Sequence, residues 1–221
     1  MLSVENYICQ LIELLKRRFG PRLSYVGLQG SYLRGEATAD SDIDIMVVID
    51  SLTAADLDTY RTVIESLDHV EKSCGFLCGK EDLANWNPLE LCHLCHTTKD
   101  CYGELSGLVP AWTREDVRNF VKLSVNNLYH ELCHRYIHST QERNASALPS
   151  TYKGVFYILQ NLHYLNHGEF AATKKHLLFL LNGLDREVLQ RSMDMSRGVA
   201  WDFSESFALL FTWCKRTLAS L

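Results

Sequence analysis

Long apolar runs are absent from this sequence. No stretch of its 221 residues approaches the roughly 20 apolar residues that a membrane-spanning helix needs. Residues 1–6 also lack the basic and apolar regions of a secretory signal peptide. We therefore expect a cytoplasmic protein without a membrane partner.

Basic residues are not in excess either. The 22 Lys and Arg are outnumbered by 27 Asp and Glu, so the formal net charge is −5 at pH 7. Because binding to the nucleic-acid backbone needs clustered positive charge, stable nucleic-acid binding is not expected. Internal repeats and low-complexity tracts are absent as well. The eight cysteines, without an export signal, indicate reduced thiols and not a disulfide framework.

What the sequence does contain is a pair of short apolar runs around a Gly-Ser turn. Residues 25–28 lead to Gly30 and Ser31, and ten residues later the second run opens with Asp42 and Asp44. Side chains at alternate positions of a strand point to the same face. Asp42 and Asp44 are therefore predicted to project together, while the apolar residues between and after them are buried.

Two neighbouring carboxylates repel each other unless a cation lies between them. Hard divalent cations such as Mg²⁺ take carboxylate oxygens and share their remaining positions with substrate phosphates. A glycine at position 30 lets the backbone approach a phosphate, and the Ser31 hydroxyl with nearby N–H groups can hold its oxygens. The pattern predicts a site for a metal-bound nucleoside triphosphate.

Gly30-Ser31, ten residues and Asp42-x-Asp44 together resemble the signature of the DNA polymerase β-like nucleotidyltransferase superfamily, in its minimal and antibiotic-modifying branches. The resemblance implies transfer of AMP, or another nucleoside monophosphate, from Mg²⁺-bound ATP (or another NTP) to a hydroxyl, with release of pyrophosphate. It implies that Asp42 and Asp44 are catalytic residues that bind Mg²⁺. Gly30 and Ser31 would seat the β- and γ-phosphates, assisted by Arg34.

The acceptor is less constrained than the nucleotide. An acidic chain with this resemblance favours a small cationic acceptor, an aminoglycoside-like antibiotic, and antibiotic resistance as the outcome. Two alternatives stay open. One is a minimal nucleotidyltransferase of the toxin–antitoxin kind that AMPylates a protein, and the other is a non-catalytic nucleotide-binding protein.

One departure from the family pattern favours the non-catalytic alternative. The family usually carries a third acid on the next strand, beside the Asp pair, and the strand predicted over residues 71–79 has no carboxylate there. Glu71 lies at its start and Glu81 beyond its end. Removal of the acceptor proton then needs another base. Glu131 is our candidate, because related enzymes draw the base from a neighbouring domain.

The first half of the chain alternates between helical and strand patterns. Apolar spacing predicts helices over residues 4–19 and 53–67, and a strand over residues 71–79 follows the two strands of the motif. We therefore expect an α+β fold that begins with a nucleotidyltransferase domain, residues 1–110, in which a mixed sheet is flanked by helices.

Only helical patterns follow residue 110. The predicted helices cover residues 114–138, 152–166, 173–181, 185–193 and 201–218. Thr113 is the predicted N-cap of the first, with Asp116 as its capping-box partner. A polar loop is predicted over residues 141–150. We therefore expect a C-terminal α-helical bundle domain, residues 111–221.

A lysine opens one of these helices. Residues 168–175 resemble the segment of aminoglycoside adenylyltransferases that carries a phosphate-contacting lysine at the start of a helix in the second domain. A helix N-terminus with a lysine suits a triphosphate. Lys174 is therefore our candidate for reaching the nucleotide from the helical domain.

Residues 130–134 match H-E-x-x-H, the helix motif of zinc proteases. His130 and His134 share a helix face and could bind Zn²⁺. A protease also needs a third ligand and a strand nearby, and neither follows in the sequence. We expect a histidine-rich helix surface without a metal.

Residues 92–96 match C-x-x-C-H, the haem attachment pattern. That chemistry belongs to exported proteins, so haem is not expected here. Cys92 and Cys95 could instead bind a structural Zn²⁺ with Cys74 and Cys78, but the C-x₃-C spacing of the latter pair within a strand does not fit a zinc knuckle. Buried, reduced thiols are the preferred interpretation.

Overall fold

The computed structural model describes residues 3–221. These residues form two compact units, of which the first ends at Ala111 and the second spans Trp112–Leu221. This division lies one residue after the boundary proposed from the sequence. Within residues 3–221, no helix combines the length and apolar character that spanning a bilayer requires.

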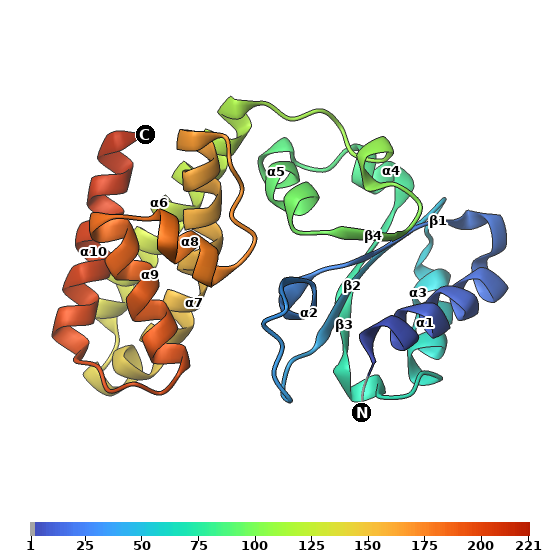
Figure 1. Cartoon of the computed structure of the whole chain (residues 1–221), viewed down its shortest axis with the longest axis horizontal. Helices are drawn as coiled ribbons and strands as arrows, with labels where there is room; N and C mark the ends of the chain where they lie inside the picture. The colour runs from blue at the N-terminus through green and yellow to red at the C-terminus, as the bar shows by residue number, and fades with distance from the viewer. Residues whose placement is uncertain (1–2) are drawn as a thin grey trace. The chain divides into compact units, whose positions relative to one another are not determined.

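The first unit is a four-stranded sheet with helices on both faces (Figure 1). Short 3₁₀ turns occur at Gly20–Arg22, Val70–Lys72 and Leu105–Gly107. In chain order, the helices and strands are α1 (Val4–Phe19), β1 (Leu23–Leu28), α2 (Gly30–Arg34), β2 (Ile43–Ile49), α3 (Ala54–Glu65), β3 (Ser73–Gly79), α4 (Lys80–Ala84), α5 (Pro88–His96) and β4 (Lys99–Tyr102).

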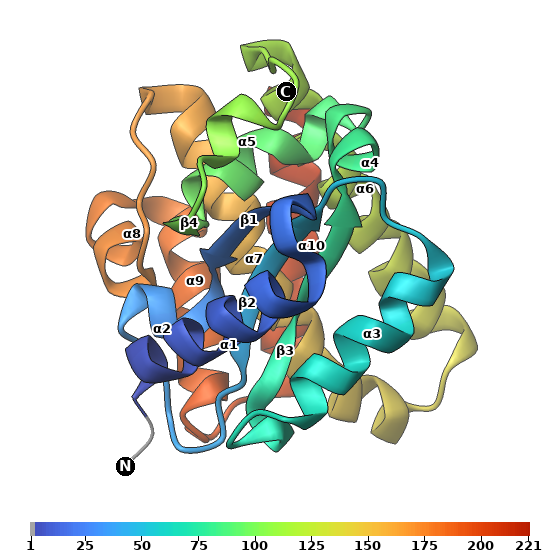
Figure 2. The ribbon, with the colours of Figure 1, turned by 90° about the vertical axis from the view of Figure 1, so that its right-hand side faces the viewer.

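The sheet is mixed, as predicted. Its strand order is β3-β2-β1-β4, with β1 antiparallel to both β2 and β4 and with β2 parallel to β3. β1 and β2 are therefore the central strands. These are the two strands of the Gly-Ser and Asp-x-Asp motif, and they lie side by side (Figure 2).

Alternation along β2 gives the sheet two apolar faces. Ile43, Ile45 and Val47 are buried in one cluster with residues of α1 and α3. Met46 and Val48 are buried in a second cluster with residues of β3 and α4. Helix α1 lies over one face of β2 (Figure 2), and polar residues occur at the N-terminal end of the strand.

The second unit is all helical. It contains α6 (Arg114–His138), α7 (Gln141–His167), α8 (Lys174–Leu180), α9 (Gly183–Ser196) and α10 (Phe203–Ser220). The predicted start of α6 is confirmed, because the Thr113 backbone N–H and hydroxyl donate to Asp116 Oδ2 at 2.7 and 2.6 Å. Trp213 of α10 is fully buried in the core, and its indole N–H donates to Asp185 Oδ1 at 2.7 Å.

The polar loop predicted over residues 141–150 is wrong, because these residues are the first turns of α7. Asn144, Leu148 and Tyr152 recur every fourth residue and are all buried, which gives the segment a buried helical face despite its polar composition. Thr140 caps it by accepting from Arg143 N–H at 3.4 Å. Pro149 lies inside the helix without ending it.

Candidate active site

The Gly-Ser turn and the Asp-x-Asp strand meet directly. Gly30 begins α2 with a φ of 69°, and a Cβ added to it would lie 1.9 Å from Asp44 Oδ2. The residue before it, Gln29, donates its backbone N–H to the Asp44 carbonyl at 2.8 Å. A side chain at position 30 is thus disfavoured twice, by the backbone conformation and by the Asp44 carboxylate, which it would displace. The Gly-Ser turn and the start of the Asp-x-Asp strand therefore pack directly against each other.

The two aspartates stand where β2 begins. Asp42 directly precedes the strand and is exposed, while Asp44 is its second residue and is half-buried. Both lie on the face that Met46 and Val48 bury further along, because alternate residues share a face. The predicted pattern, with acids on one side and buried Ile43, Ile45 and Val47 on the other, is present in the structure.

Arg34 is held by the loop that follows it. Its Nε donates to Glu36 Oε2 at 2.9 Å, and only 12% of its side chain is exposed. The Glu36 backbone N–H in turn donates to the Ser31 carbonyl at 2.9 Å. The loop therefore folds back onto the Gly-Ser turn and keeps the guanidinium in the same neighbourhood. The predicted phosphate-contacting role of Arg34 stays a prediction.

The far side of the loop is tied to the 3₁₀ turn that directly precedes β3. The ammonium group of Lys72 donates to the Ala39 carbonyl at 2.6 Å, three residues before Asp42. The spacer between Ser31 and Asp42 is consequently anchored near both of its ends. Such anchoring fixes the backbone that delivers the first carboxylate.

The residue beside Asp44 on the next strand is a cysteine. The parallel register of β2 and β3 pairs Asp44 with Cys74, and paired residues point to the same side of the sheet. Partial desolvation and the charges of Asp44 and Asp42 raise the pKa of the Cys74 thiol, so it is protonated at neutral pH. The sequence indicated Cys74 only as a buried thiol or a possible zinc ligand, whereas in the structure it is exposed and lies beside Asp44.

Neither nearby glutamate takes that position. Glu71 belongs to the 3₁₀ turn before β3, where its carboxylate lies 3.5 Å from His69 Nδ1. Glu81 lies in α4, beyond the opposite end of β3. The absence of a third acid beside the aspartates, noted from the sequence, therefore holds for the strand register of the structure.

The C-x-x-C-H segment is the helix α5, which sequence reasoning did not predict. Its half-buried His93 lies close enough to Arg34 for the two to interact, and desolvation, the Arg34 charge and His96 lower the pKa of His93 to about 4. Cys92 is buried, and burial raises the pKa of its thiol to about 12. Within residues 3–221, no group of three or more His, Cys, Asp or Glu side chains is arranged to hold a metal ion.

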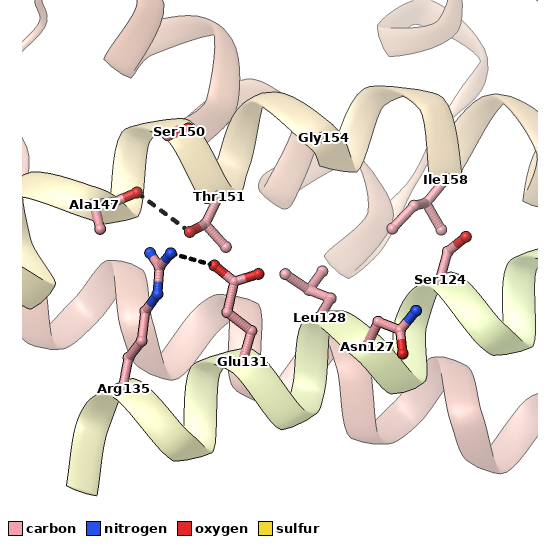
Figure 3. Close-up of a pocket in the computed structure, with 10 residues that line it drawn as sticks. All are labelled: Ser124, Asn127, Leu128, Glu131, Arg135, Ala147, Ser150, Thr151, Gly154 and Ile158. Carbon is pink, nitrogen blue, oxygen red and sulfur yellow. Dashed lines mark hydrogen bonds and ion pairs between the residues drawn. The ribbon is translucent and has the colours of Figure 1, made fainter. Parts of the chain in front are cut away.

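Glu131 lies in a groove of the second unit, between α6 and α7. The groove has a volume of about 490 Å³, and Figure 3 shows the side chains of Glu131 and Arg135 extending from α6 into it. The Glu131 carboxylate accepts from Arg135 at 2.9 Å, and both side chains are 41% exposed. The role of Glu131 as the base stays a prediction.

Lys174 is the first residue of α8, after the N-cap Thr173. The Thr173 hydroxyl accepts from the His176 backbone N–H at 3.1 Å, which starts the helix as the sequence predicted. The Lys174 ammonium group lies 5.7 Å from the centre of the Phe156 ring of α7. The lysine is thus positioned against the bundle, and its contact with a nucleotide stays a prediction.

The histidines of the H-E-x-x-H motif lie on an exposed face of α6. The ring centroids of His130 and His134 are 6.0 Å apart, and those of His134 and His138 are 4.8 Å apart. All three side chains are exposed, and α6 belongs to a unit without strands. The sheet edge on which a zinc protease would hold an extended peptide is therefore missing from residues 112–221.

Comparison with known proteins agrees with the geometry. Residues 8–95 match the nucleotidyltransferase domain family. No curated protein matches the sequence. The structure is similar to that of spectinomycin adenyltransferase AAD(9) from Enterococcus faecialis, determined with ATP and spectinomycin, with a TM-score of 0.60, 14% sequence identity, and coverage of 98% of this chain and 100% of that one.

A toxin–antitoxin structure determined with AMP-PNP is 24% identical over 61% of this chain and 94% of its own, at a TM-score of 0.34 that does not bear on the fold. The likeness to AAD(9), by contrast, extends over both units and shows a shared fold. The matched residues 8–95 contain all of α2, β2 and β3, the elements that bring Gly30, Asp44 and Cys74 together. The chain therefore contains a nucleotidyltransferase domain over residues 8–95, and its fold is similar to that of a spectinomycin adenyltransferase.

Proposed function

We propose that this protein transfers AMP from ATP to a hydroxyl group of a small-molecule acceptor and releases pyrophosphate. The observation that carries the proposal is the contact between Gly30 and Asp44, which joins a phosphate-binding turn to a pair of carboxylates. A nucleotide placed on this turn would have its phosphates beside the only two acids at the N-terminal end of β2 in the described chain.

The donor set suits Mg²⁺ bound together with a triphosphate. Asp42 and Asp44 offer hard carboxylate oxygens, and residues 3–221 hold no arrangement of three or more metal-binding side chains. Mg²⁺ is commonly bound by one or two carboxylates plus substrate phosphates, so two acids are sufficient. Bound there, the cation would neutralise charge that develops on the α-phosphoryl group.

Each side chain then has a defined task. Asp42 and Asp44 orient the cation, and the Ser31 hydroxyl with the backbone N–H groups at the start of α2 seats the β- and γ-phosphates. The acceptor oxygen forms a bond to the α-phosphorus as the bond to the bridging oxygen breaks, and pyrophosphate leaves. Glu131 takes the proton of the acceptor hydroxyl. Arg34 and Lys174 contribute positive charge to the leaving phosphates.

The acceptor that we propose is an aminoglycoside-like antibiotic. The similarity in fold to a spectinomycin adenyltransferase over the full length of both chains supports this acceptor class. The net charge of −5 also favours a cationic acceptor over an anionic one. We place the reaction in the cytoplasm, where ATP is available and thiols stay reduced, and expect resistance to the acceptor antibiotic as its outcome.

The test compares two double variants of equal charge change. Asp42→Asn with Asp44→Asn is expected to abolish Mg²⁺-dependent ATP binding in calorimetry and to leave the melting temperature unchanged or higher, because two crowded like charges are removed. The control is Asp58→Asn with Asp68→Asn, which alters exposed residues of the same unit and should bind Mg·ATP like the wild type. Equal ATP binding by all three proteins would refute the site. Transfer of labelled AMP to a panel of aminoglycosides, lincosamides and co-encoded proteins then identifies the acceptor.

A further inference from the structure

Asp44, one of the two proposed cation ligands, has a neighbouring strand on each side within the sheet. Toward β1, Asp44 faces the turn at Gln29 and Gly30, which offers backbone but no charge. Toward β3, the register pairs Asp44 with Cys74. Position 74 is therefore the one place in the sheet from which a side chain in register could join the two carboxylates.

The pairing of β2 and β3 is regular through this position, from Ile43 and Ser73 to Ile49 and Gly79. The next residue of β3, Gly75, has a φ of 151°, so a Cβ added to it would lie 1.9 Å from the Ile45 carbonyl oxygen. Partial desolvation, together with the charges of Asp44 and Asp42, raises the pKa of the Cys74 thiol, which agrees with its place beside the two carboxylates. Cys74 is also exposed, which leaves it open to the space where a cation would be bound.

We propose, taking the function proposed above as given, that Cys74 limits the protein's share of the cation site to two carboxylates, so that the divalent cation enters together with the triphosphate and not before it. A carboxylate at this position would complete a cluster of three acids. Because the affinity of hard cations rises with the charge of their ligands, such a cluster would hold the cation without nucleotide. Cys74 is thus a specificity-determining residue that couples cation binding to nucleotide binding.

The experiment measures binding of Mn²⁺, a spectroscopic substitute for Mg²⁺, by the paramagnetic resonance signal of the free ion. Without nucleotide, Cys74→Asp is expected to bind Mn²⁺ roughly tenfold more tightly than the wild type, or more. The matched control is Cys74→Asn, which has the shape of the aspartate without its charge and should bind Mn²⁺ like the wild type. Adding Asp42→Asn and Asp44→Asn to Cys74→Asp should remove the gain.

Thermal unfolding gives a second readout that does not depend on activity. Three crowded carboxylates repel one another, so Cys74→Asp should melt below Cys74→Asn without metal and recover with Mn²⁺. Should Cys74→Asp fail to fold, Cys74→Glu serves in its place. Equal Mn²⁺ affinity of the Asp and Asn variants would overturn the role of Cys74 alone, whereas failure of the wild type to bind Mn·ATP would overturn the proposed function.

Discussion

Gly30 and Asp44 share one small space, in which a methyl group on the glycine would lie 1.9 Å from a carboxylate oxygen of the aspartate. This relationship makes Gly30→Ala a sharp probe of the site. Gly35, at the end of the same helix, has nearly the same φ, 66° against 69°, but has no atom within 4 Å of an added Cβ. Comparing Gly30→Ala with Gly35→Ala therefore separates the effect of backbone strain from the effect of displacing the Asp44 carboxylate.

We expect both alanine variants to lose about 1–2 kcal/mol of unfolding free energy, because a non-glycine residue is strained at positive φ. Only Gly30→Ala should also lose Mg·ATP affinity, since its methyl group pushes Asp44 away. Chemical denaturation and calorimetry measure the two effects. Equal nucleotide affinity of the two variants would show that Asp44 does not hold the cation.

Glu131→Gln tests the proposed base. The amide keeps the shape of the side chain but cannot take a proton, so turnover should fall roughly a hundredfold while ATP affinity is retained. The ion pair with Arg135 is 41% exposed on both sides, and its loss should change stability by less than about 1 kcal/mol.

Arg135→Gln is the control for Glu131→Gln, because it breaks the same ion pair and leaves the carboxylate in place. Its turnover should stay within a fewfold of the wild type in a steady-state assay. A loss as large as that of Glu131→Gln would assign the effect to the groove and not to proton transfer.

Lys174→Ala tests the phosphate contact proposed for the second unit. Removing its charge should weaken ATP binding about tenfold and leave AMP binding unchanged, if the ammonium group contacts the β- or γ-phosphate. Lys175→Ala is the matched control, because it removes the same charge from the adjacent, more exposed residue. Calorimetry with both nucleotides measures the difference. Equal losses of ATP affinity in Lys174→Ala and Lys175→Ala would indicate only a general charge effect.

His93 predicts a pH dependence of stability. Its folded-state pKa of about 4 lies below the 6.5 of a free histidine, so the unfolded chain binds more protons between these values. Stability should therefore fall as the pH drops from about 6.5 to about 4, by up to about 3 kcal/mol from this residue. His93→Gln should flatten the profile in this window, and His138→Gln, on an exposed helix face, should not. Identical profiles for His93→Gln and the wild type would contradict this prediction.

The sequence predicted the central strands and the face on which Asp42 and Asp44 lie, because their apolar and acidic residues alternate with period two. It did not predict α5, although Pro88 after the N-cap Asn87 is a helix-start signal, because this nine-residue helix is too short for a clear apolar period. The first turns of α7 were missed for a tertiary reason. Asn144 donates its side-chain N–H to the Arg135 carbonyl at 2.8 Å, so a polar residue is buried there as a cap of α6.

The candidate site, like the fold, could be predicted from the sequence only in part. Motif spacing identified Gly30 and Asp44, but that the glycine is required by the aspartate itself is a steric fact that only coordinates provide. The position of Cys74 beside Asp44 depends on the pairing register of β2 and β3. The hydrophobic pattern predicts which face of a strand is buried but not which residues of two strands are paired. The interactions of Arg34 with Glu36 and His93 depend on how the loop and α5 fold.

The space shared by Gly30 and Asp44 also bears on how sequence variants of this chain should be interpreted. A glycine in such a turn is usually attributed to the approach of a phosphate, but here an added Cβ would also displace the Asp44 carboxylate. A descendant that had lost the chemistry and kept the aspartate would still favour glycine at position 30. A homologue that keeps both Gly30 and Asp44 therefore has an intact turn but is not necessarily active. Asp42 is exposed, so a substitution there is the better sign that a homologue has lost activity.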